Sequence, residues 1–297
     1  MVPAPQVDVQ QVKHLHTTTR TPSHLNSVDN DAANNNLEPD YLDNDKGSTN
    51  SKEENPQPSN TIVITMASKK YLDITENMLR SIATLHIGPN ITIIAADEET
   101  YTHFSSNPSV HVVPPQQIQT VQDMSWTNGT RSFVYTRYSY ILDALCHNQD
   151  VLMADVDTVW LENPFPYLAQ VNSDVVLQWN PEDHLCPGLA YYRSTKNTIQ
   201  FLRKLIKKLK TRERDTVLIN MLLNENVVPQ LRYEIFEIRK FVSGLYYFDD
   251  DWRADNPDVR PIIVHADGIN TFSRDTAYWH DLKVQFLKKY GLWFFRD

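Results

Sequence analysis

Residues 61–297 are predicted to form an α/β domain with a mostly parallel central sheet flanked by helices. Short β-branched apolar runs recur along this part of the chain, and segments with helical spacing of apolar residues lie between them. Strands that alternate with helices indicate parallel pairing, because a parallel neighbour is reached only through a long crossover. The chain has 297 residues, 41% of them hydrophobic, which suits one large or two small domains.

The predicted elements of the first half begin at residue 61. Three apolar runs are interpreted as strands and two amphipathic segments as helices: TIVITMAS at 61–68, a helix over Tyr71–Leu85, ITIIAADE at 91–98, VHVVPP at 110–115 and a helix over Ser132–His147. The prolines at the end of 110–115 stop the third strand, because proline cannot donate a hydrogen bond to a neighbouring strand.

The second half opens with DVLMADVDTVW at 150–160, which is interpreted as one central parallel strand. Further strands and one long helix follow it: SDVVLQWN at 173–180, LAYYRST at 189–195, a helix over Thr198–Lys210 and RPIIVHADG at 260–268. No internal repeat is visible.

Residues 1–60 differ in composition and are predicted to be a disordered tail. They contain nine Asn, six Pro, one aromatic residue, and nine acidic against four basic side chains. Such a segment cannot bury enough apolar surface to offset its chain entropy. The tail carries five of the nine net negative charges. The domain is therefore close to neutral, and nothing in its charge favours a nucleic-acid partner.

Targeting signals in the sequence are few. No run of eighteen apolar residues exists, so no membrane span is expected in this chain, and the first residues, MVPAPQVDVQQ, lack the regions of a signal peptide. Two glycosylation sequons, Asn90-Ile91-Thr92 and Asn128-Gly129-Thr130, favour the secretory pathway. Cys146 and Cys186 allow at most one disulfide, so they do not identify the cellular compartment.

Asp155 and Asp157 lie at the predicted carboxyl end of the strand at 150–160. In open α/β sheets, ligands bind outside the carboxyl ends of the strands. Two carboxylates on one face can share a hard divalent cation, and that cation can hold a diphosphate. The residues alone also allow a structural interpretation, in which Asp155 caps the strand and Asp157 begins a turn before Pro164.

Several segments around this pair resemble one protein family, in the same order along the chain. VLMADVDTVWLENPFPYL at 151–168, SDVVLQWN and GLAYYRST at 188–195 are similar to the nucleotide-diphospho-sugar transferase family, which includes plant cell-wall xylosyl- and arabinosyltransferases. The resemblance covers about residues 61–297 and returns at Arg214–Asn220, at VHADG and at the terminal GLW. It implies a GT-A fold, a Rossmann-like α/β domain that binds a sugar nucleotide through an Asp-x-Asp motif and manganese.

The resemblance implies a metal site built from two aspartates and one histidine. Asp157 is then the direct ligand, Asp155 contacts the donor ribose and completes the metal shell, and His265 is the third protein ligand. Mn²⁺ or Mg²⁺ is the expected cofactor, and an imidazole nitrogen beside carboxylates suits Mn²⁺. The alternative for His265 is a histidine that only caps a strand end.

Four further residues receive donor-site roles from the same resemblance. Arg137 contacts the diphosphate, and its alternative is an arginine that faces solvent. Asp215 is the catalytic residue that hydrogen-bonds the transferred sugar, and its alternative is an N-cap for the following helix, a position that Asp favours. Gly188 and Gly244 are positions where the backbone must approach the donor closely.

The chain departs from the family pattern around the expected sugar pocket and the last strand. Leu185-Cys186-Pro187-Gly188 stands where the family has Asn-Thr-Gly, Thr216 stands for Gln, and Asp267 stands for Asn. The Asp-x-Asp pair is intact.

The resemblance implies a metal-dependent, retaining glycosyltransferase of the Golgi lumen. It moves a hexosyl or pentosyl unit from a nucleotide sugar, expected to be a UDP-sugar, to a glycan or glycoprotein acceptor. Two other functions stay open. One is a haloacid-dehalogenase-type phosphatase with Asp155 as nucleophile and Asp157 as acid–base, although about ninety residues of the predicted domain precede the motif and 160–166 contains no glycine for its flap. The other is a catalytically weak sugar-nucleotide or glycan-binding domain, suggested by positions 186, 187 and 216.

Removal of the tail tests the predicted boundary at residue 61. A chain that begins near Asn55 should unfold at the same temperature as the full chain, because the polar tail contributes no apolar core. Calorimetry of the two chains measures this. A Tm lower by more than a few degrees in the shortened chain would show that the tail packs on the domain.

Overall fold

The computed structural model describes residues 60–115, 130–181, 184–209, 214–269 and 278–295. The predicted disordered tail lies outside the described residues apart from Asn60, and so do Asn128 and Gly129 of the second sequon. Strand β1 begins at Thr61, where the sequence predicts the first strand.

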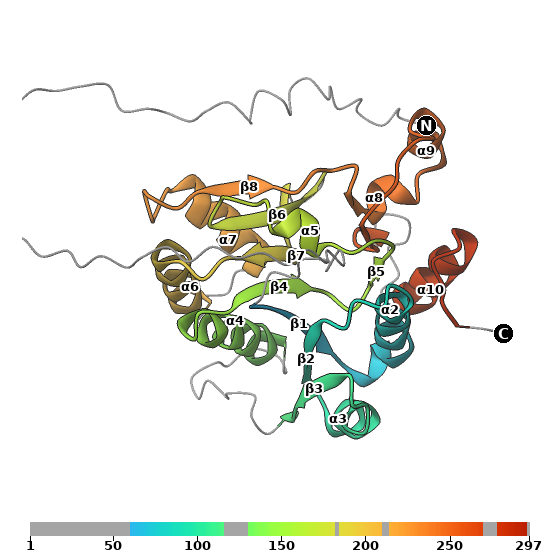
Figure 1. Cartoon of the computed structure of the whole chain (residues 1–297), viewed down its shortest axis with the longest axis horizontal. Helices are drawn as coiled ribbons and strands as arrows, with labels where there is room; N and C mark the ends of the chain where they lie inside the picture. The colour runs from blue at the N-terminus through green and yellow to red at the C-terminus, as the bar shows by residue number, and fades with distance from the viewer. Residues whose placement is uncertain (1–59, 116–129, 182–183, 210–213, 270–277, 296–297) are drawn as a thin grey trace, which may run out of the picture. The chain divides into compact units, whose positions relative to one another are not determined.

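A seven-stranded sheet forms the centre of the domain, in the order β3-β2-β1-β4-β7-β6-β8. Figure 1 shows this sheet edge-on, with β8 at the top and β3 at the bottom. Strands β3, β2, β1 and β4 are parallel, β7 runs antiparallel to β4 and β6, and β8 is parallel to β6. The predicted mostly parallel sheet is therefore confirmed. Its strands are β1 Thr61–Ala67, β2 Asn90–Ala95, β3 Val110–Val113, β4 Asp150–Ala154, β6 Val175–Asn180, β7 His184–Tyr192 and β8 Tyr233–Ile235.

A second, three-stranded sheet has the order β5-β10-β9. Its strands are β5 Thr158–Trp160, β9 Phe241–Ser243 and β10 Ile263–His265. The single strand predicted over 150–160 is wrong, because the chain leaves the main sheet after β4 and enters the second sheet at β5. A hydrogen-bonded turn separates the two strands: the Asp155 amide donates to the Gly188 carbonyl at 2.6 Å, and the Thr158 amide and hydroxyl donate to the Asp155 carbonyl at 3.1 and 2.9 Å.

The helices cover both faces of the main sheet, and the three predicted long helices are each found within two residues of their expected ends. Helix α6 begins earlier than predicted because the Thr195 hydroxyl caps it by accepting the Thr198 amide. Among the described residues, no helix is both long and apolar enough to cross a membrane. The helices are η1 Lys69–Tyr71, α2 Leu72–Thr84, α3 Glu98–Ser105, α4 Thr130–Cys146, α5 Phe165–Leu168, α6 Lys196–Lys208, α7 Asp215–Asn224, α8 Gly244–Tyr247, α9 Asp250–Asp255 and α10 Trp279–Lys289.

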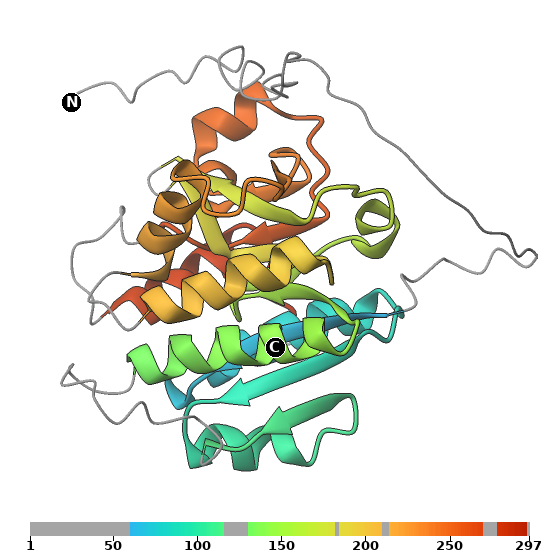
Figure 2. The same cartoon turned by 90° about the vertical axis from the view of Figure 1, so that its left-hand side faces the viewer.

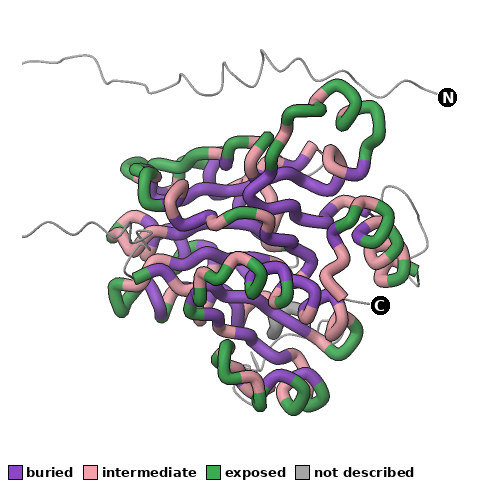
Figure 3. Tube along the Cα trace, turned by 45° about the vertical axis from the view of Figure 1, so that its right-hand side comes forward, coloured by how far each residue is buried: buried purple, intermediate pink, exposed green. Residues whose placement is uncertain are grey.

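Alternate residues of each central strand enter opposite halves of the core. In β1, Ile64 packs in the cluster that includes side chains of α4, α6 and α7, while Val63 packs in the cluster of α2 and α5. Figure 2 shows α4 and α6 side by side across one face of the sheet. Burial on both faces explains why the strand sequences are almost continuously apolar. Figure 3 shows the resulting buried centre of the domain, with exposed residues on the outer helices.

The segment after α10 is fastened to α2 by a buried asparagine. Asn77 is 1% exposed. Its side-chain amide donates to the Leu292 carbonyl at 2.9 Å, and its side-chain oxygen accepts the Phe294 amide at 2.6 Å. Leu287 of α10 packs with Phe248 and Val264, which ties the helix to the second sheet. These contacts fix α10 beside the edge where β4 and β10 end.

Replacement of Asn77 tests this attachment. Asn77→Ala should lower the free energy of unfolding by about 2 kcal/mol, because it leaves a backbone carbonyl and a backbone amide without their partner. Denaturant unfolding measures the change. Asn172→Ala, at an exposed position, is the matched control and should change stability by less than about 0.5 kcal/mol. Equal stability of Asn77→Ala and the unmodified chain would contradict the proposed fastening.

Candidate active site

The pairing of β5 with β10 brings residues from two distant parts of the chain together. His265 lies opposite Thr158 in the antiparallel register, and the Ala266 amide donates to the Asp157 carbonyl at 2.9 Å. The family resemblance implied that Asp157 and His265 meet as ligands of one metal ion. They do meet, but His265 belongs to the second sheet and reaches Asp157 through an antiparallel strand pair.

The side chains of Asp155, Asp157 and His265 converge. His265 Nε2 lies 3.2 Å from Asp157 Oδ1 and 4.0 Å from Asp155 Oδ2. His265 Nδ1 lies 2.7 Å from Oε1 of Gln178, an oxygen that can only accept, so Nδ1 carries the proton of this bond. Gln178 therefore orients the ring so that Nε2 faces the two carboxylates.

The spacing of these three groups fits one divalent cation. Two ligand atoms that are each about 2.1 Å from a first-row metal ion lie at most about 4.2 Å apart, and both distances from His265 Nε2 are within that limit. Gly188 leaves room beside them, because a Cβ there would lie 2.4 Å from Asp155 Oδ2 and 2.7 Å from His265 Cε1. The geometry suits a metal site, and the ligand roles stay predictions.

Opposite charges hold this group together. Burial disfavours the charged form of Asp157, but Lys283 and His265 outweigh it and hold the Asp157 pKa well below its ordinary value. Burial also acts against the protonated imidazole, yet Asp157 and Asp267 raise the pKa of His265 well above its ordinary value. Partial burial raises the pKa of Asp155, and the Arg137 guanidinium opposes the rise. An imidazole that binds a metal ion must be neutral.

A second charged chain extends from Asp155 to Asp215 through Arg137. The side chain of Arg137 is 9% exposed, donates from Nη1 to Asp155 Oδ1 at 3.2 Å, and pairs through Nη2 with Asp215 Oδ2. The Tyr138 hydroxyl donates to the same Asp215 oxygen at 3.0 Å. The solvent-facing alternative for Arg137 is therefore wrong. Asp215 is also not the N-cap, which is Arg214, because its carboxylate turns to Arg137 and Tyr138.

Gly244 and Asp267 form a third polar cluster. Asp267 Oδ1 accepts the Ser243 hydroxyl at 2.7 Å and the Gly244 amide at 2.8 Å, and Oδ2 accepts the Asn180 side-chain amide. A Cβ on Gly244 would lie 2.6 Å from the Asp267 carbonyl oxygen. The close approach at Gly244 is thus to the chain's own backbone, and its donor role stays a prediction. At position 267 this chain has Asp where the family has Asn. Both carboxylate oxygens of Asp267 accept hydrogen bonds.

Sequence reasoning missed Lys283. Its ammonium pairs with Asp157 Oδ2 and donates to the Ala266 carbonyl at 2.7 Å. The signal was available, because Lys283 lies one helical turn before Leu287, the buried residue of α10, and so on the same inward face. Gln178 was also missed, although it interrupts the apolar run of β6. Cys146 and Cys186 are both free thiols, and burial raises the pKa of Cys186.

A cavity of about 250 Å³ opens at this group of residues. It lies outside the carboxyl end of β1, between η1, α4, the turn after β4 and α10. Its lining consists of Met66, Ser68, Tyr71, Val134, Arg137, Asp155, Val156, Asp157 and Lys283.

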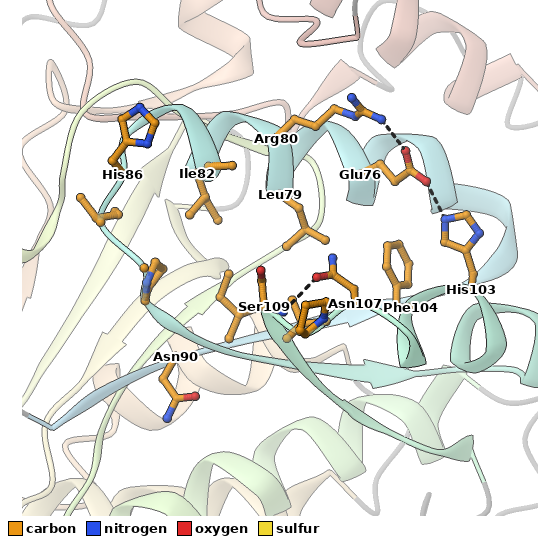
Figure 4. A pocket seen from close by; sticks show the side chains of 17 residues that line it. Glu76, Leu79, Arg80, Ile82, His86, Asn90, His103, Phe104, Asn107 and Ser109 are labelled. Atoms are coloured by element: carbon orange, nitrogen blue, oxygen red, sulfur yellow. Dashed lines mark hydrogen bonds and ion pairs between the residues drawn. The ribbon is translucent and has the colours of Figure 1, made fainter.

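A wider cleft of about 970 Å³ lies between α2, β2, α3 and β3 (Figure 4). It opens at the amino end of β2, where the exposed Asn90 begins the strand. Strands β1, β2 and β4 are parallel, so their amino ends lie on one side of the sheet and their carboxyl ends on the other. The cleft is therefore on the side of the amino ends, opposite to Asp155. Two of its polar contacts, Glu76 with Arg80 at 3.4 Å and with His103 at 2.6 Å, lie among partly exposed side chains.

Two relatives of this chain are both named as glycosyltransferases. UDP-D-xylose:L-fucose alpha-1,3-D-xylosyltransferase of Arabidopsis thaliana is 23% identical over 266 residues, which span 80% of this chain and 70% of that protein. UDP-galactose:fucoside alpha-3-galactosyltransferase of Dictyostelium discoideum is 25% identical over 57% of this chain and 29% of its own.

The fold is shared with a solved structure, the glycosyltransferase GlyE of Streptococcus pneumoniae. Its apo form aligns with a TM-score of 0.51 at 14% identity, over 77% of this chain and 60% of that chain. The predicted GT-A-type fold is confirmed by this likeness together with the order of the strands. Residues 86–275 match the family profile described as nucleotide-diphospho-sugar transferase. The chain therefore belongs to the nucleotide-diphospho-sugar transferase family, whose members are glycosyltransferases.

Proposed function

We propose that this chain is a divalent-metal-dependent, retaining glycosyltransferase that uses Mn²⁺ or Mg²⁺ and a UDP-sugar. The observation that carries the proposal is the convergence of Asp155, Asp157 and His265 beside the Arg137–Asp215 pair. Carboxylate and imidazole ligands suit Mn²⁺. Asp155 and Asp157 follow the carboxyl end of β4, and such strand ends are where α/β sheets bind nucleotides.

Each residue of the group has a distinct task in this proposal. Asp157 and His265 hold the cation, with Asp155 beside them and near the donor ribose. The cation, when bound, supplies electrostatic stabilisation of the diphosphate leaving group. The guanidinium of Arg137 faces the diphosphate, and its pairs with Asp155 and Asp215 keep it oriented before the donor arrives.

In this proposal, the chain promotes the transfer step by positioning the donor and the acceptor. Asp215 holds the sugar hydroxyls, while the bond from the anomeric carbon to the phosphate breaks and a bond to the acceptor oxygen forms on the same face. The departing phosphate oxygen takes the proton of the acceptor hydroxyl, so no protein nucleophile is required. The residues of the chain act by holding donor and acceptor in place, which is a large part of the catalysis of such reactions.

The choice of UDP rests on the names of the relatives. The Arabidopsis xylosyltransferase and the Dictyostelium galactosyltransferase are both named for UDP-sugars. For this chain we propose a glycan or glycoprotein acceptor and the Golgi lumen as the compartment. Asn90, the first residue of one sequon, is exposed and so accessible for glycosylation.

The alternatives are separated by one assay. The phosphatase interpretation is not favoured, because the chain belongs to a glycosyltransferase family and the two aspartates share a histidine. A binding domain without turnover is the remaining competitor. Incubation of the purified chain with radiolabelled UDP-sugars and Mn²⁺ distinguishes transfer or donor hydrolysis, which supports an enzyme, from binding alone.

Substitution of the proposed ligands tests the metal site. Asp157→Ala should abolish Mn²⁺-dependent binding of UDP, because it removes the carboxylate nearest to His265. His265→Ala should weaken that binding only in part, since other ligands remain. Titration calorimetry of UDP with and without Mn²⁺ measures both, with exposed Asp251→Ala as the matched control. Unchanged binding in His265→Ala would reduce His265 to a strand-end residue.

Asp215→Asn tests the proposed contact with the donor sugar. Turnover should fall by about a hundredfold, as for the loss of a positioned electrostatic contact. UDP without a sugar should bind no more weakly, because the proposed contact is to the sugar and the Asn side-chain oxygen can still accept from Arg137. Asp258→Asn, which alters an exposed ion pair with Arg239, is the control. Equal kcat values for Asp215→Asn and the unmodified chain would remove Asp215 from the catalytic residues.

A further inference from the structure

Helix α10 places a lysine ammonium inside the proposed metal site. Nζ of Lys283 pairs with Asp157 Oδ2 and donates to the Ala266 carbonyl at 2.7 Å, and the side chain is 17% exposed. Lys283 also lines the cavity of about 250 Å³ beside Arg137 and Asp155. The proposed transfer reaction assigns no role to this cation.

The two oxygens of Asp157 face different partners. Oδ1 lies 3.2 Å from His265 Nε2, on the side of the proposed cation, and Oδ2 carries the ammonium. A divalent cation bound through Oδ1 would therefore share one carboxylate with the positive charge of Lys283. Like charges at this separation repel strongly, because little water lies between buried groups to screen them.

The charge of Lys283 is not needed to satisfy its hydrogen-bond acceptors. Asp157 Oδ2 and the Ala266 carbonyl both accept from Nζ, and a neutral amide can donate to the same two atoms. Burial of an ammonium is costly unless it is paired, so the position of this charge depends on its pair with Asp157. The positive charge therefore points to an electrostatic role.

We propose that Lys283 is the resident counter-cation of Asp157 and lowers the affinity of the donor-free site for free divalent cations. The inference rests on the proposed function, since it takes Asp157 and His265 as metal ligands. Its consequence is that the cation is held firmly only when a nucleoside diphosphate supplies further oxygen ligands. Lys283 is thus a positioning residue that acts on the metal through Asp157.

The test is the binding of Mn²⁺ alone to the full chain, measured by electron paramagnetic resonance of the free ion. Lys283→Gln keeps an amide donor but removes the charge, and it should bind Mn²⁺ about tenfold more tightly, within the usual range of coupling between sites. Lys283→Arg keeps the charge and should not bind more tightly. Lys288→Gln is the matched control, because Lys288 is an exposed lysine of the same helix.

Unchanged or weaker Mn²⁺ binding in a folded Lys283→Gln would overturn the proposal and leave Lys283 as a structural anchor. Lys283→Met is a second neutral variant, and calorimetry reports whether each variant is folded. If both neutral variants fail to fold, the ion pair is required for the structure, and the proposal is likewise overturned. Binding of UDP with Mn²⁺ to the unmodified chain is measured in parallel. Absence of this UDP binding would contradict the proposed function, whereas the comparison of affinities for free Mn²⁺ would still test the role of Lys283.

Discussion

The antiparallel pairing of β5 with β10 is the constraint on which the site depends. The three register pairs of this short ladder, and the bond from the Ala266 amide to the Asp157 carbonyl, set the distance between two segments about a hundred residues apart. Without them, the turn at 155–157 would have two carboxylates and no histidine. The ladder is itself held from both sides, by the core around Trp160 and by the packing of Leu287 in α10.

The charged side chains at the carboxyl end of β4 are arranged so that opposite charges compensate each other. Asp155 and Asp215 share the Arg137 guanidinium, while Asp157 lies between His265 and Lys283. Isolated charges in such a place would be unstable, because burial without a partner costs several kcal/mol. Pairing lets the chain keep three carboxylates beside a cavity in which a diphosphate is proposed to bind. It also orients each side chain before any ligand arrives, so less ordering is needed on binding.

Two residues at which this chain departs from the family pattern, Asp267 and Cys186, have defined contacts in the structure. Asp267 accepts three hydrogen bonds, from Asn180, Ser243 and Gly244, and so joins β6, β9 and α8 to the segment after β10. Cys186, which is half-buried, lies close enough to His265 and Asp267 for the three to form a compact group. Gly188, which follows the altered residues, is retained where any side chain would collide with Asp155 and His265. Of the altered residues, Cys186 and Asp267 therefore lie beside His265, and Gly188 keeps the space next to Asp155 open.

The sequence by itself determined the α/β class, the mostly parallel sheet, the long helices and the family, because these depend on local apolar periodicity and on motifs that are contiguous in the chain. It also singled out Asp155, Asp157, Arg137, Asp215 and His265, which lie together in the folded domain.

Only the tertiary structure decided how these residues meet. The break between β4 and β5 was not predictable, because it depends on the pairing of β5 with β10, about a hundred residues further along the chain. The same holds for Lys283, whose partner Asp157 is 126 residues away. Local propensity allowed Asp215 as an N-cap, yet Arg214 holds that position and the Asp215 carboxylate pairs with the buried guanidinium of Arg137. Local pattern encodes which surfaces are buried, whereas the pairing of charges depends on contacts that form only when distant segments pack together.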